Sequence, residues 1–136
     1  MKKSTRSSTR SETFVDTSGF YALLVQRDAM HVRAMRVLAE AAQTNGRFVT
    51  SDYILDETAT LLVARGVAHL TDSFFDTVFT SAACRVEWMD AERFDQVRKF
   101  FVKHRDKGWS FTDSFSFWLM RSLGLREAAE KLTALG

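Results

Sequence analysis

The fold of this chain is decided at residues 13–19, which read Thr-Phe-Val-Asp-Thr-Ser-Gly. The first three are β-branched or aromatic, which is typical of a short buried strand, and the polar residues after them favour a turn. Asp16 therefore follows directly on a predicted strand. In parallel α/β sheets ligands bind beyond the carboxyl ends of the strands, although Asp-Thr-Ser-Gly is equally good turn chemistry.

Outward from this stretch, predicted strands and helices alternate. Residues 48–50 and 84–89 read as further short strands. Apolar residues at helical spacing predict helices at 20–24, 31–43, 54–64, 70–82, after an N-cap at 90, and at 113–123. Strands separated by helices imply right-handed crossovers, so the fold class is α/β with a parallel sheet covered on both faces. Residues 125–136 should add one more strand, yet their pattern looks helical.

Composition sets limits on class and compartment. The 136 residues, 46% of them hydrophobic, are enough for one globular core. We expect one domain at residues 12–136 after a disordered basic extension at 1–11. The single cysteine, Cys84, cannot form an internal disulfide, and we interpret it as a small buried core residue in a reducing compartment. No apolar run is long enough to span a membrane and no signal-type stretch follows the basic head, so we expect a soluble cytoplasmic protein.

Two more acidic residues stand out by their positions on predicted helices. Glu57 shares a helix face with Ile54 and Leu61, where a carboxylate is costly unless it is paired or binds a metal. The alternative is a residue at the edge of that face, extending to solvent or pairing with Arg65. Asp113 completes a Ser-x-x-Asp pattern typical of a capping box, and capping alone explains it well. Each acid has an ordinary explanation by itself, so the case rests on their combination.

That combination resembles a known family. The stretches 14–23, 56–58 and 106–117 resemble PIN-domain ribonucleases, especially VapC-type toxins, and order and spacing agree from about residue 14 to 124. The resemblance implies a three-layer α/β/α sandwich whose acidic residues meet at one end of a short parallel sheet. Asp16, Glu57 and Asp113 fall on the family's first three acidic positions, and Thr112 falls on the hydroxyl beside the third.

The resemblance also implies an activity, a metal-dependent endoribonuclease that hydrolyses RNA phosphodiester bonds. Clustered carboxylates repel one another unless a divalent cation shares their charge. Oxygen ligands favour Mg²⁺ or Mn²⁺, and no Cys/His cluster offers a zinc site. The three histidines lie far apart in sequence and are interpreted as solvated surface residues.

One departure from the family pattern puts activity in question. The family places a fourth acid about where Lys131 stands, and no aspartate follows Asp113. Glu130 is the candidate replacement, with Glu127 as the other choice. Three acids can hold one metal ion, so we expect one metal rather than two, and weaker binding than in a four-acid member.

Partners follow from the resemblance and from charge. It implies an RNA substrate, with tRNA and rRNA both candidates, a small antitoxin and a homodimer. The net charge of +2 permits a polyanionic partner. Basic residues preceding the third motif form a stripe that suits RNA phosphates or is simply the solvated side of a helix: Arg93, Arg98, Lys99, Lys103, Arg105 and Lys107.

Three other functions stay open on the sequence: a degenerate PIN domain that binds RNA or protein without cleavage, a related nuclease of DNA, and a small-molecule phosphatase. Phe74, Phe75 and Phe79 are interpreted as core rather than interface residues.

Overall fold

Three short parallel strands form the centre of the computed structural model, which describes residues 11–125. They are β1 (Glu12–Phe14), β2 (Arg47–Ser51) and β3 (Cys84–Glu87), in the order β1-β2-β3. Phe14 lies opposite Val49, which in turn lies opposite Arg85, and both pairings are parallel. The predicted parallel sheet is confirmed, and its strands all end at the same edge.

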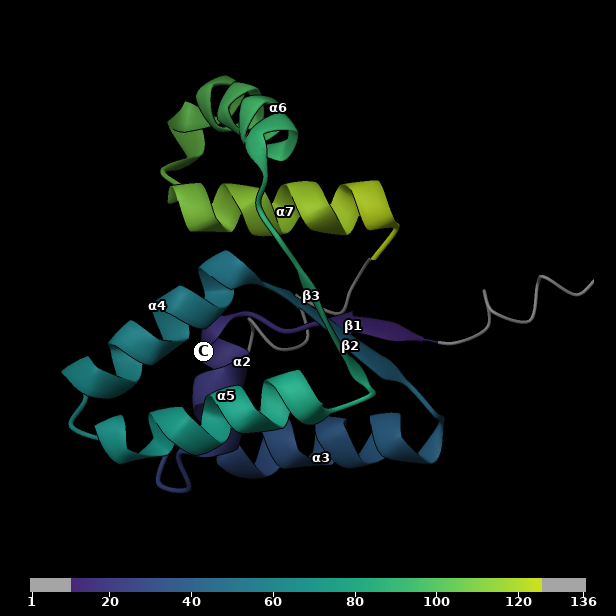
Figure 1. Ribbon diagram of the computed structural model, residues 1–136, viewed down its shortest axis with the longest axis vertical. Helices are drawn as coiled ribbons and strands as arrows, with labels where there is room; N and C mark the ends of the chain where they lie inside the picture. The colour runs from purple at the N-terminus through teal and green to yellow at the C-terminus, as the bar shows by residue number, and fades with distance from the viewer. Residues whose placement is uncertain (1–10, 126–136) are drawn as a thin grey trace, which may run out of the picture.

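Helices cover the sheet on two sides (Figure 1). Two of them, α6 (Ala91–Lys103) and α7 (Phe111–Leu123), lie on one side. The other side carries α2 (Thr17–Leu24), α3 (His31–Gln43) and α5 (Thr71–Thr80), and α4 (Asp52–Ala64) packs beside α2. Short 3₁₀ turns, η1 (Ala68–Leu70) and η2 (Arg105–Lys107), precede α5 and α7. The three-layer α/β/α arrangement expected from the resemblance is present.

Polar residues directly after strands or loops begin four of the helices. The side chains of Asp16, Ser51, Asp90 and Ser110 each accept a hydrogen bond from a backbone N–H in the first turn. Such caps satisfy donors that a helix start leaves unpaired. They explain why α2 and α4 start at Thr17 and Asp52, earlier than apolar spacing indicated. The helix expected at 70–82 is instead η1 followed by α5.

The core draws its largest buried side chains from the sheet and from both helical layers. Phe14, Phe74 and Phe115 are all at most 1% exposed, with Leu62 and Leu119 beside them at 0%. Within residues 11–125, no helix has the length and apolar character needed to cross a membrane. All but the first residue of the segment expected to form a strand at 125–136 lies outside the described residues. So do the two replacement candidates, Glu127 and Glu130, and residues 1–10 of the expected extension.

Three interpretations of single residues need correction. Cys84 is only partly buried and packs against the core rather than inside it. Phe79 is 56% exposed because it lies on the outer face of α5, although Phe74 is core as expected. His31 and His104 are not simply solvated: His31 Nδ1 lies 2.8 Å from the carbonyl oxygen of Ala22 in α2, and His104 Nδ1 lies 2.8 Å from that of Phe100 in the last turn of α6.

Candidate active site at the carboxyl edge of the sheet

Asp16 is the N-cap of α2 and lies two residues after the end of β1. The N–H of Val15 donates to the Val49 carbonyl at 2.9 Å, and the buried hydroxyl of Thr50 donates to the Val15 carbonyl at 3.0 Å. These bonds fix the backbone just before Asp16. The half-buried Asp16 carboxylate accepts a hydrogen bond from the N–H of Gly19 at 2.9 Å. Asp16 is thus a helix cap as well as a strand-end acid, and the positive end of the α2 dipole stabilises its charge.

Glu57 reaches the same edge from α4. It is exposed, at the border of a buried face that includes Ile54, Thr58 and Leu62. The hydroxyl of Thr17 donates a hydrogen bond to Glu57 Oε1 at 2.5 Å. Arg65 takes no part in this contact, since its guanidinium lies over the Tyr21 ring, 5.2 Å from the centroid. The partner of Glu57 is therefore a residue adjacent to Asp16, not the arginine on its own helix.

Asp113 lies in the first turn of α7. Ser110 Oγ accepts from the N–H of Asp113 at 3.0 Å, and Asp113 Oδ2 accepts from the N–H of Ser110 at 3.1 Å, so the predicted capping box is confirmed. The exposed Asp113 side chain uses Oδ2 in this bond, which leaves Oδ1 for another ligand. Thr112 precedes it and is half-buried.

Aromatic contacts bring the starts of α4 and α7 to one place. The Tyr53 ring lies 6.2 Å from Phe111 and 5.3 Å from Phe115, centroid to centroid. Tyr53 belongs to the first turn of α4, which follows β2, and the two phenylalanines flank Asp113. The third acid is therefore presented at the same end of the molecule as the strand ends.

The three carboxylates are nevertheless not gathered into one cluster. Asp16 and Glu57 are joined through Thr17, whereas Asp113 engages Ser110. Over residues 11–125, no group of three or more His, Cys, Asp or Glu side chains is placed to hold a metal ion. The expected convergence of all three acids is absent from this arrangement, and their joint binding of a cation stays a prediction.

The chemistry of the donor set suits a hard divalent cation. All three candidate ligands are carboxylates, two are exposed, and Asp16 and Asp113 lie in or beside the first turn of a helix. Mg²⁺ and Mn²⁺ prefer such oxygen donors. Repulsion between like charges disfavours a cluster of carboxylates unless a cation shares their charge.

Thr17 is the site residue that our reading of the sequence missed. The available signal was a hydroxyl side chain immediately after a strand-end aspartate. Its contact with Glu57 joins residues 40 positions apart, and no local pattern encodes such a contact.

The basic stripe is partly neutralised by acidic neighbours. Arg93 pairs with Glu87 at 2.7 Å, and Asp95 receives Arg98 at 2.7 Å and Lys99 at 3.2 Å. These hydrogen bonds lower the pKa of Asp95, led by the one from Lys99. Half of the six basic residues therefore have an ion-pair partner, which favours the solvated-helix interpretation for that half.

Comparison with known proteins covers nearly the whole described chain. The model of the family described as PIN domain matches residues 13–130. The 23S rRNA-specific endonuclease VapC20, from two strains of Mycobacterium tuberculosis, is 35% identical over 115 residues, 85% of each chain. A VapC ribonuclease of Archaeoglobus fulgidus is 26% identical over 114 residues, 82% of this chain and 72% of that protein.

The similarity extends to a solved structure. The crystal structure of Mycobacterium tuberculosis VapC20, described as a toxin that cleaves the sarcin–ricin loop, superposes with a TM-score of 0.75 at 32% identity. The match covers 93% of this chain and 95% of that one.

Proposed function

Since this chain belongs to the PIN-domain family, we propose that it is a VapC-type endoribonuclease toxin whose Asp16, Glu57 and Asp113 together hold a divalent metal ion, Mg²⁺ or Mn²⁺. The single observation that carries the site assignment is the bond from Thr17 to Glu57. It joins the second acid to the residue beside the first, at the carboxyl edge of a parallel sheet, where α/β proteins bind their ligands.

In this proposal, the metal ion supplies the chemistry of phosphodiester hydrolysis, and residues of the chain hold and orient its ligands. A bound ion of this kind supplies an activated water and offsets the charge that develops on the phosphate. Asp16 is fixed by its cap to Gly19, Glu57 is held by Thr17, and Asp113 is held by Ser110, so each ligand has a partner that limits its rotation. The hydroxyl of Thr112 would stand beside the third ligand and orient it or the phosphate.

The relatives support a proposal for the substrate class. VapC20 acts on 23S rRNA and is described as cleaving its sarcin–ricin loop. We propose that this chain cuts a structured rRNA stem–loop, is neutralised by a cognate antitoxin and acts as a homodimer. Because ribosomes are its proposed target, we expect it to work in the cytoplasm.

A cleavage assay tests the proposal. Purified protein is incubated with a synthetic rRNA stem–loop in Mn²⁺, in Mg²⁺ and in EDTA, and the products are mapped on a sequencing gel. We expect one dominant cut with either metal and none in EDTA. Glu57→Gln removes the cut, whereas Asp56→Asn, an exposed neighbour on α4, keeps it.

Two outcomes of the cleavage assay would contradict the proposal. Binding of the stem–loop without any cut, at every metal concentration and also with tRNA and 23S rRNA, would leave the degenerate binding-only function in place of the nuclease. Equal cleavage by Glu57→Gln and wild type would show that the metal ligands lie elsewhere.

A further inference from the structure

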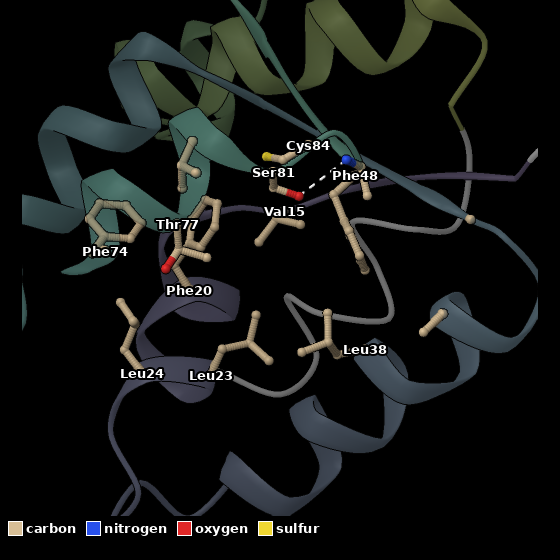
Figure 2. Close-up of a pocket in the computed structure, with 14 residues that line it drawn as sticks. Val15, Phe20, Leu23, Leu24, Leu38, Phe48, Phe74, Thr77, Ser81 and Cys84 are labelled. Carbon is tan, nitrogen blue, oxygen red and sulfur yellow. Dashed lines mark hydrogen bonds between the residues drawn. The ribbon is translucent and has the colours of Figure 1, made fainter.

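An apolar groove lies on the sheet face opposite α6 and α7, between the sheet and helices α2, α3 and α5. Figure 2 shows its walls: Val15, Phe48 and Cys84 from the sheet side face Leu23 of α2 and Leu38 of α3. Val78 of α5 also lines the groove. Its volume is about 310 Å³. Among the lining residues within 11–125, only Thr77 and Ser81 carry a side-chain hydroxyl.

Water is a poor occupant for such a space. Each buried water needs two to four polar partners, and the groove offers few. Protein interiors are otherwise packed to crystal density, so an apolar space of this size calls for apolar side chains. The expected occupant is therefore a peptide segment with a non-polar face.

The chain itself supplies a segment of that kind. Leu125 is 8% exposed and belongs to the same core cluster as Val15 and Phe20, which line the groove. The next residues, 126–136, read Arg-Glu-Ala-Ala-Glu-Lys-Leu-Thr-Ala-Leu-Gly. Ala128, Leu132 and Leu135 recur at i, i+4 and i+7, the spacing of one helix face. The segment therefore starts at the core and carries an apolar stripe.

Reach and tethering favour this occupant over a separate chain. Eleven residues span roughly 16 Å as a helix and up to roughly 36 Å when extended. A segment attached to the core is present at an effective concentration in the millimolar range, which is far above that of a second copy in dilute solution.

We propose that residues 126–136 dock into this groove, with Leu132 and Leu135 entering the space between β2, α3 and α5. This C-terminal dock completes the core on the α3 side of the sheet, and it is independent of whether the carboxylate edge binds metal. A partner protein that needs the groove would have to displace the chain's own end.

Cys84 reports directly on the dock because it lines the groove and is the only cysteine. Reaction with a thiol reagent is followed at fixed pH, since the thiolate is the reactive form and burial raises the pKa of Cys84. We expect slow labelling of the full chain, and labelling faster by about tenfold or more after Leu132→Glu, equivalent to about 1.4 kcal/mol of lost protection. Thr133→Glu, with the same charge beside the apolar stripe, should label like wild type.

A second measurement keeps the test valid if Leu132→Glu unfolds the protein. The full-length variants Leu132→Cys and Leu135→Cys are oxidised mildly, and at least one should form an intramolecular disulfide with Cys84, whereas Thr133→Cys should not. Absence of a crosslink in both, or labelling of Cys84 unaffected by Leu132→Glu in a folded protein, would overturn the proposal. Protection that grows with protein concentration would assign the groove to a second copy, and protection gained only on adding another protein would assign it to that partner.

Discussion

At the scale of single residues, the edge of the sheet is organised by side chains that serve two roles. Asp16 and Asp113 cap helices and are also the candidate ligands, while Thr17 begins α2 and orients Glu57. A cap tolerates exchange among a few polar residues, but a ligand requires the negative charge. Substitutions that keep the capping group but remove the charge or the hydroxyl therefore show whether a residue acts as a cap, as a metal ligand or as both.

Thr17→Val keeps the size and branching of the side chain and removes only the hydroxyl that holds Glu57. Partners that orient a metal ligand typically contribute 10–100-fold to metal affinity or activity, so we expect Mn²⁺ affinity to fall by about that factor. Thr17→Ser should restore most of it. Calorimetric titration with Mn²⁺ measures both, with Ser18→Ala as the control. Equal affinity in Thr17→Val and wild type would contradict the orienting role.

Asp16→Asn preserves the cap, because asparagine caps as well as aspartate, and removes one charge from the acidic edge. We expect metal binding and cleavage to fall by more than about 100-fold, beyond the effect of an orienting partner. In EDTA the melting temperature should stay equal to that of wild type or rise, since like-charge repulsion is relieved. Thermal unfolding in EDTA checks this, and a clear drop would show that the Asp16 carboxylate is structural.

At the scale of elements, the sequence predicted types and order well because caps and apolar periods are local. The helix at 31–43 has the expected bounds, and Asp90, Gly124 and the box at Ser110 have the expected roles. The starts of α2 and α4 were placed too late because cap geometry, not apolar spacing, sets them. Contacts such as Tyr53 with Phe111 depend on tertiary packing, which no local signal encodes.

The capping box of α7 links element stability to the site. Ser110→Ala should lower the free energy of unfolding by about 1 kcal/mol and also weaken metal binding, because Asp113 loses the turn that holds it. Asp90→Ala removes the matched cap of α6, in which Asp90 Oδ1 accepts a hydrogen bond from the N–H of Arg93 at 2.8 Å, and Asp90 is none of the three candidate ligands. This variant should lower the free energy of unfolding by a similar amount and leave metal affinity unchanged. Urea unfolding measures the stability of each variant, and Mn²⁺ titration measures its metal affinity. Equal losses of Mn²⁺ affinity in Ser110→Ala and Asp90→Ala would contradict a specific role of the Ser110 cap in holding Asp113.

At the scale of the whole molecule, the parallel sheet explains why the sequence could predict the edge that carries the candidate site before the geometry of that edge was known. Strand ends converge at one edge whatever the details, so Asp16 and the helices after β2 and β3 had to meet there. The positions of the side chains at that edge are not set by the sheet topology. Asp113 accepts a hydrogen bond from the N–H of Ser110 and Glu57 accepts one from the Thr17 hydroxyl, and sequence order alone does not predict these partners.

The last prediction concerns the missing fourth acid. Mg²⁺ and Mn²⁺ prefer six oxygen ligands, and each lost anionic ligand lowers affinity, so a three-carboxylate site should bind weakly. We expect Lys131→Asp, which restores an acid at the family position, to tighten Mn²⁺ binding. We expect Glu130→Gln to weaken it, because the long glutamate side chain can reach the edge from a shifted backbone position. The apolar stripe at 128, 132 and 135 leaves residue 130 on the opposite helix face, so a docked segment does not bury this carboxylate. Calorimetry on the two variants decides. Unchanged affinity in both would show that the C-terminal segment contributes nothing to the metal site, whatever its place in the groove.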